Sequence, residues 1–177
     1  METRKAIRCR KSVRSYTGEK VSEEELSAIL EAAYAAPAGS GRYDTLLVTV
    51  IEDKELLSLI DEAGHQVFGD PFRHPLYGAP TLILVSVRPY EGGEPGNLEF
   101  SNAAGVVENM ALAAVDLGVG CLHVWGPVYG INRQPAIRER LSLPEGFVPS
   151  AALIVGKTGY SYPERKIAAR IRTMFIR

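Results

Sequence analysis

The 177-residue chain is poor in the residues that build metal sites and disulfide frameworks, with two cysteines and three histidines. Cys9 lies in a basic segment and Cys121 in an apolar one, so the chain has no C-x-x-C motif and no cysteine pattern typical of a secreted scaffold. The histidines stand apart and form no H-E-x-x-H motif. We therefore predict no metal site, and we interpret the cysteine usage as that of a cytoplasmic protein.

The motifs of several large protein classes are also absent. No G-x-G-x-x-G follows a predicted strand and no G-x-x-x-x-G-K-[ST] occurs, which disfavours dinucleotide-fold dehydrogenases and phosphate-loop ATPases. The chain has no G-x-S-x-G elbow of a serine hydrolase. No stretch approaches the ~20 apolar residues of a transmembrane helix, and no apolar signal-peptide core opens the chain. We expect no membrane partner.

Positive charge is concentrated at the two ends of the chain, although the net charge is only -1. Residues 8–16, RCRKSVRSY, place four cations around Ser12, and the tail at 157–177 is basic as well. A solvated helix end and a nucleic-acid-binding arm are both compatible with such runs. A phosphate site is a third interpretation, because the planar donor fork of arginine matches phosphate oxygens and serine adds a further donor. The charges alone do not decide among the three.

Hydrophobic periodicity predicts alternating helices and strands. Ser22 and Glu25 form a capping-box pattern at the start of one helix, and Pro37 stops it. The other expected elements are a strand at 45–53, a helix at 53–68 that ends in a loop near Gly69 and Pro71, a strand at 80–89, a helix at 98–117, a strand at 119–125, a helix at 135–141 and a strand at 149–156. With 46% hydrophobic residues and no repeat, the pattern predicts one α/β or α+β domain.

Several segments together resemble the nitroreductase family of FMN-dependent oxidoreductases. They are RKSVRSY at 10–16, AAPAGSG at 35–41, the Ala-rich stretch that runs into LGVG at 102–121, WGPVYG at 125–130 and PEGFVPSAALIVGK at 144–157. The resemblance covers nearly the whole chain. It implies a three-layer α+β fold with a central, mainly antiparallel sheet flanked by helices. It also implies a single FMN-binding domain over residues 1–177, whose domain-swapped C-terminal tail at 157–177 reaches the partner subunit.

The resemblance implies a phosphate site at the basic ends of the chain. It consists of Arg10, the backbone of Lys11, Ser12 and two tail residues, Arg165 and Lys166. Arg14 matches a cation near the pyrimidine end of the flavin, where charge develops when the ring is reduced. Arg73 or His74 is a second candidate there, because the flavin-contacting lysine of some relatives falls near Pro75 in this chain.

Two further segments are expected at the flavin ring. The resemblance implies that Pro127, Val128, Tyr129 and Gly130 form a loop over it, with the backbone of Tyr129 and Gly130 assisting at N5 and no catalytic side chain. Pro37, Ala38 and Gly39 are expected to reach the flavin of the other subunit. Residues 41–45, GRYDT, depart from the Asn and Gln-Pro-Trp of relatives, so Arg42 or Tyr43 is expected to shape the substrate side.

The implied function is ping-pong reduction of nitroaromatics, quinones or similar flat acceptors, with FMN as cofactor and NAD(P)H as a transient electron donor. The small-residue helix from Ala103 to Ala114 favours a homodimer with the flavin at its interface. We expect no nucleic-acid partner. One alternative is another flavin reaction on the same fold, such as dehydrogenation, dehalogenation or flavin breakdown. Another is a non-catalytic flavin-binding redox sensor, and a third is nucleic-acid binding by the basic ends.

Overall fold

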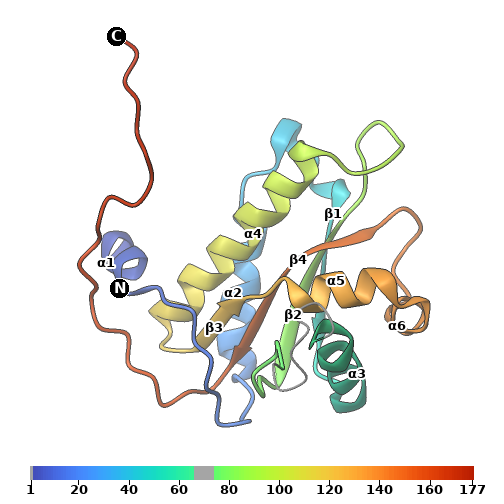
Figure 1. Cartoon of the computed structure of the whole chain (residues 1–177), viewed down its shortest axis with the longest axis horizontal. Helices are drawn as coiled ribbons and strands as arrows, with labels where there is room; N and C mark the ends of the chain where they lie inside the picture. Colours follow the sequence, from blue (N-terminus) through green and yellow to red (C-terminus); the bar gives the residue numbers. More distant parts are fainter. Residues whose placement is uncertain (1, 66–73) are drawn as a thin grey trace.

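The computed structural model describes residues 2–65 and 74–177. Within these residues, a four-stranded antiparallel sheet in the order β1-β2-β4-β3 forms the centre of the protein (Figure 1). Its strands are β1 (Leu46–Ile51), β2 (Thr81–Val87), β3 (Gly120–His123) and β4 (Val148–Gly156). Every residue of β2 is buried, as its unbroken apolar run predicts for a central strand.

Helices cover both faces of this sheet, which makes three layers (Figure 1). The α-helices are α1 (Thr3–Cys9), α2 (Glu23–Tyr34), α3 (Lys54–His65), α4 (Asn97–Asp116), α5 (Gly126–Arg133) and α6 (Pro135–Leu141). Two short 3₁₀ turns, η1 (Gly39–Gly41) and η2 (Tyr43–Thr45), precede β1. The predicted α+β class and the antiparallel sheet flanked by helices are confirmed.

One layer consists of α2 and α4, with α1 packed on α4. The predicted capping box begins α2: the Ser22 hydroxyl accepts from Glu25 N–H at 3.2 Å, and the Glu25 carboxylate accepts from Ser22 N–H at 2.7 Å. Ile29 and Ala33 are buried on the inner face of this helix. The long α4 crosses the sheet and buries Met110 completely.

The opposite layer consists of α3, α5 and α6. Here α5 approaches α3 so closely that a Cβ atom on Gly130 would lie 2.7–2.9 Å from the atoms of Ala63, shorter than real Cβ contacts. Glycine at 130 is therefore required by packing rather than by a turn. This contact fixes the position of α5 against α3.

The helix α1 in the basic N-terminus was not predicted; it forms because Ala6 and Cys9 share one face and bury it against α4. One predicted feature was wrong. Residues 126–133 form α5 rather than a loop, since proline is favoured in the first turn of a helix and burial of Val128 and Ile131 offsets the two glycines. Positions 66–68 of the predicted helix at 53–68, and the loop near Gly69 and Pro71, lie outside the described residues.

The C-terminal tail leaves β4 at Lys157 and contains no helix or strand. It runs beside the N-terminal segment and α1 and then extends away from the body (Figure 1). Among the described residues, none of the helices combines the length and apolar character that a bilayer crossing requires.

Candidate functional site

Residues 10–16 follow α1 and form an extended segment that contains no helix or strand. This segment is hydrogen-bonded to the edge strand β3. Val13 N–H donates to the carbonyl of Cys121 at 3.0 Å, and the Val13 side chain is buried. The Tyr16 hydroxyl donates to the Val13 carbonyl at 3.1 Å, and burial raises the pKa of this tyrosine. Because neighbouring side chains alternate along an extended strip, burial of Val13 leaves Ser12 and Arg14 on the outer side.

Arg10 lies at the end of α1 in a small charged cluster. Its Nε atom is 3.7 Å from a Glu108 carboxylate oxygen, and His123 Nε2 is 3.2 Å from the other oxygen. The hydrogen bond with His123, together with the charge of Arg10, lowers the pKa of Glu108. A separation of 3.7 Å is longer than a charge-assisted hydrogen bond. Within the described residues the guanidinium of Arg10 donates no hydrogen bond, so its N–H groups are available to an anion.

The C-terminal tail brings a second set of cations to the same place. Arg165 Nε donates to the carbonyl of Arg8 at 3.0 Å, its backbone N–H donates to the same oxygen at 3.3 Å, and Arg8 pairs with Glu164 at 3.6 Å. The Lys11 ammonium lies 4.9 Å from the ring centre of Tyr160. The two basic ends of the chain are therefore adjacent, and Lys166 follows at an exposed position.

Arg14 lies beside the turn that precedes β2. Its guanidinium carbon is 5.9 Å from the ring centre of Tyr77, and Nη1 lies 3.4 Å from the Ser12 carbonyl. The alternative candidate, His74, is held by Asp61 with Nδ1 2.7 Å from the carboxylate, and Arg73 lies outside the described residues. Of the two described candidates, His74 is therefore engaged by a carboxylate, whereas Arg14 is exposed and has no acidic partner among the described residues.

The first turn of α5 lies close to that same turn. A Cβ atom on Gly64 would meet Pro75 at 2.8 Å and the backbone of Gly126 and Pro127 at 3.0–3.1 Å, so three segments converge there. Tyr129 N–H already donates to the carbonyl of Trp125 at 3.0 Å, and this engagement excludes the predicted free donor at Tyr129.

Gly130 N–H likewise falls inside α5, beyond the first turn. The N–H groups of Gly126 and Val128 belong to that first turn, where no carbonyl of the helix can accept them. Pro127 between them has no N–H.

Pro37, Ala38 and Gly39 do not join this group within one chain. Gly39 N–H donates to the Asn102 side-chain oxygen at 3.0 Å, near the beginning of α4. Arg10 lies beside Glu108, farther along the same helix, and Figure 1 shows the two regions apart.

The divergent residues 41–45 form a local charged network. Arg42 forms a bidentate pair with Asp44 at 2.8 and 3.0 Å, and its guanidinium carbon lies 4.2 Å from the ring centre of Tyr90. Arg88 donates to the same carboxylate at 2.8 Å, and these partners keep the pKa of Asp44 well below its usual range. Arg42 is thereby committed to neighbours, whereas Tyr43 is 56% exposed.

Glu108, Tyr77 and Tyr160 are site neighbours that the sequence did not indicate. An acid on a face of α4 otherwise rich in small residues was the available signal for Glu108. The tyrosines carried no signal, because their relation to Arg14 and Lys11 arises only in the folded chain. Among the described residues, no group of three or more histidine, cysteine, aspartate or glutamate side chains is placed to hold a metal ion.

The model of one protein family, described as the nitroreductase family, matches residues 7–157. This chain belongs to the nitroreductase family. Among relatives of the family, a protein of Archaeoglobus fulgidus with the provisional name NADH dehydrogenase/NAD(P)H nitroreductase is 32% identical over 156 residues, which are 88% of this chain and 84% of that protein. A Bacillus subtilis FMN reductase whose name specifies NAD(P)H is 31% identical over 168 residues, with 88% of this chain and 65% of that protein covered.

Solved nitroreductases share the fold. One from Desulfitobacterium hafniense, with bound FMN, matches with a TM-score of 0.82 and 26% identity over 99% of this chain and 100% of that one. One from Bacteroides fragilis, also with bound FMN, matches with a TM-score of 0.81 and 25% identity over the same shares.

Proposed function

We propose that this protein is an FMN-dependent oxidoreductase that takes its electrons from NAD(P)H. The observation that carries the proposal is the meeting of the two basic ends of the chain around Arg10 and Ser12, in a family with solved FMN-bound members. Arginine, lysine and a serine hydroxyl are the donors that a phosphate dianion prefers. The residues present therefore fit the phosphate of FMN.

Arg10, Ser12, Arg165 and Lys166 would hold the phosphate, together with the backbone of Lys11. Glu108 would orient Arg10 from the side away from the anion, because it approaches Nε and leaves the two Nη groups free of hydrogen bonds within the described residues. His123 fixes the other oxygen of that carboxylate. In this arrangement Glu108 would orient Arg10 without cancelling the positive charge of the other phosphate-binding residues.

The ring would extend from this phosphate site toward Arg14, Tyr77 and the first turn of α5. Bound FMN supplies hydride transfer through N5, so the protein needs no acidic or basic catalytic side chain. Arg14 would stabilise the negative charge of the reduced ring. The N–H groups of Gly126 and Val128 replace those of Tyr129 and Gly130 as the proposed backbone donors, while Pro127 and Val128 line the site.

We also propose a homodimer, with the flavin at the interface and the tail at 157–177 on the partner. The support is what one chain leaves exposed: Ile171, Phe175 and Ile176 are 74–88% exposed. Such side chains need a surface that the single chain does not provide. Pro37, Ala38 and Gly39, remote from Arg10 in one chain, would contact the flavin of the other subunit.

Flat acceptors such as nitroaromatics and quinones are the proposed oxidising substrates, in a ping-pong reaction. The exposed Tyr43 would border the acceptor side. Free flavin is a second candidate acceptor, favoured by the 31% identity to the Bacillus subtilis FMN reductase. Both described cysteines are buried and unpaired, which supports a cytoplasmic location.

Anaerobic stopped-flow spectroscopy tests the proposal. The purified protein, reconstituted with FMN, should show flavin bands that are bleached by NADH or NADPH. Reoxidation by menadione, nitrofurazone and free FMN, compared as rates, would rank the acceptors and separate reductase activity from other flavin reactions. A protein that binds no FMN overturns the cofactor assignment, and bound FMN that neither nucleotide reduces favours the redox-sensor alternative.

A further inference from the structure

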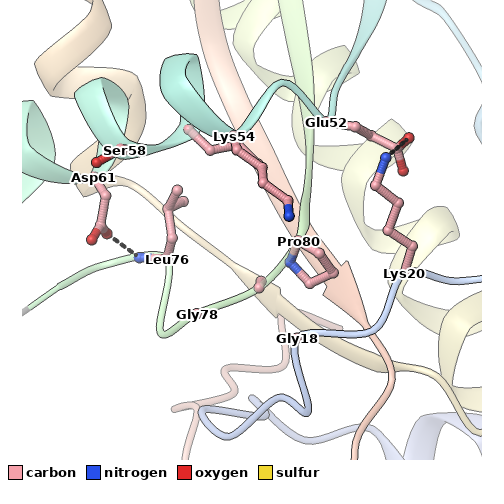
Figure 2. Close-up of a pocket in the computed structure, with 11 residues that line it drawn as sticks. Gly18, Lys20, Glu52, Lys54, Ser58, Asp61, Leu76, Gly78 and Pro80 are labelled. Carbon is pink, nitrogen blue, oxygen red and sulfur yellow. Dashed lines mark hydrogen bonds and ion pairs between the residues drawn. The ribbon is translucent and has the colours of Figure 1, made fainter.

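A pocket of about 470 Å³ lies between α3, the turn before β2 and the turn at Gly18. Figure 2 shows its polar side chains, which come from the segment before α2 (Lys20), the residue after β1 (Glu52) and α3. None of the residues assigned above to the flavin lines it. Its volume falls in the range of small-molecule sites in proteins.

The two carboxylates of this pocket are already satisfied. Glu52 accepts from the Lys20 ammonium at 2.7 Å and from the Thr81 hydroxyl at 2.8 Å. Asp61 accepts from Leu76 N–H at 2.7 Å and lies 2.7 Å from His74 Nδ1. Neither acid is left to attract a cation, and Lys20 is committed to Glu52.

Lys54 and Ser58 are different, because neither has a hydrogen-bond or ion-pair partner among the described residues. They are four residues apart on α3, so they lie on the same face of the helix, one turn apart. In Figure 2 the Lys54 ammonium points from α3 toward Pro80, over the mouth of the pocket. Among the described lining residues, Lys54 is therefore the lysine without an ion-pair partner, and Ser58 carries a free hydroxyl.

The remaining lining is apolar. Leu57 from α3 faces Leu76, Ala79 and Pro80 from the turn before β2. Leu57, Leu76 and Ala79 are otherwise buried parts of the core, so the pocket exposes the edge of that core to a ligand. An apolar wall beside the unpaired ammonium of Lys54 matches an amphipathic molecule with one negative charge.

We propose that this pocket binds a small amphipathic monoanion of the aliphatic carboxylate class. Its carboxylate pairs with Lys54, and its hydrocarbon body lies on Leu57, Leu76 and Pro80. This pocket is separate from the proposed flavin site, but the two sites share the turn before β2. Leu76 and Gly78 of that turn line the pocket, whereas the ring of Tyr77 between them lies next to the Arg14 guanidinium.

Octanoate and its neutral counterpart octanamide test the proposal by NMR titration of the ¹⁵N-labelled full chain reconstituted with FMN. An aliphatic probe avoids stacking on the flavin. Octanoate should produce saturable shifts of the Ser58 and Gly78 amides, and octanamide should bind about three- to fivefold more weakly, the range for one partly exposed ion pair. Shifts confined to residues around Arg14, or no saturation, would overturn the assignment.

Variants of exposed lysines identify the cation. Lys54→Gln should remove the preference for octanoate over octanamide, and Lys54→Arg should retain it. Lys5→Gln, which removes an exposed charge on α1, is the matched control and should change nothing at the pocket. An octanoate preference that survives Lys54→Gln contradicts the proposal. Because the titration does not depend on turnover, its failure is distinguishable from failure of the oxidoreductase function.

Discussion

The segment at 10–16 and the tail at 157–177 are both basic and both lack helix and strand, yet they differ in how they are held. The N-terminal segment buries Val13 and bonds its backbone to Cys121, so its cations have defined positions. The tail makes its last described hydrogen bonds at Arg165, and beyond that residue its side chains are exposed.

The difference shows that charge alone does not position a site. One buried valine and one backbone hydrogen bond give the first segment a fixed register. In the tail, apolar side chains such as Ile171 and Phe175 are exposed to water. Exposure of apolar surface is unfavourable. The first segment is held by contacts within one chain, whereas the residues after Arg165 are exposed in the single chain.

Removal of residues 168–177 should have the largest effect, because it would remove the contribution of the tail to the dimer. Burial of Ile171, Phe175 and Ile176 contributes at least about 4 kcal/mol, so the dimer dissociation constant should rise by about a thousandfold. FMN should also bind more weakly, because the proposed site lies at the interface of the proposed dimer. Sedimentation velocity over a concentration series, with flavin occupancy, measures both.

A triple variant, Ile171→Ser, Phe175→Ser and Ile176→Ser, is the control that keeps the chain length and the tail charges. It should reproduce most of the loss if apolar burial is the cause. A monomeric wild-type protein with full flavin occupancy would contradict both the dimer and the role of the tail.

Arg10→Ala should weaken FMN binding by about 1.5–3 kcal/mol, the range for a hydrogen bond to a charged group, and Ser12→Ala should cost less. Riboflavin, which lacks the phosphate, should lose little. Fluorescence titration with both ligands measures the difference. Arg4→Ala on α1 is the matched control, and equal FMN affinity in Arg10→Ala and Arg4→Ala would show that the phosphate lies elsewhere.

Arg14→Gln should leave FMN bound and lower the midpoint potential of the flavin by about 20–30 mV, which corresponds to about 1 kcal/mol for two electrons. The reason is that the guanidinium stabilises the reduced, negatively charged ring more than the oxidised ring. Spectroelectrochemical titration gives the potential. An unchanged or raised value in the variant would assign that charge to another residue.

Glu25→Gln should have the smallest effect, about 1 kcal/mol of unfolding free energy at neutral pH. Both oxygens of Glu25 accept from the Lys157 ammonium, at 2.6 and 2.7 Å, where the tail begins. This pair, followed by the Ser22 N–H, lowers the pKa of Glu25 below its usual 4.5. The stabilisation is therefore present above that value and is lost as the pH falls through the lowered pKa.

Urea denaturation at neutral and acidic pH checks this dependence. The difference between wild type and Glu25→Gln should shrink in acid. Glutamine still accepts from Ser22 N–H, so the capping box is preserved, and Glu23→Gln in the same helical turn controls for loss of an acid. A difference that persists in acid would show that the Lys157 charge pair is not its source.

Much of the fold could be predicted because its signals are local. The capping box at Ser22, the stop at Pro37 and the apolar run of β2 each depend on residues close together in the chain. The family resemblance also indicated Arg10, Ser12 and Arg14 as a group, since they lie within one short segment. These features require no knowledge of what packs against them.

What the sequence by itself determined was the order and type of most elements and the basic segments that form the candidate site. Only the tertiary structure made residues 126–133 a helix, because Gly130 packs on Ala63 and burial outweighs weak local propensity. Only the tertiary structure placed Glu108 at Arg10 and Tyr77 at Arg14. Those pairs join residues more than sixty positions apart, and their contacts exist only after the sheet brings distant segments together.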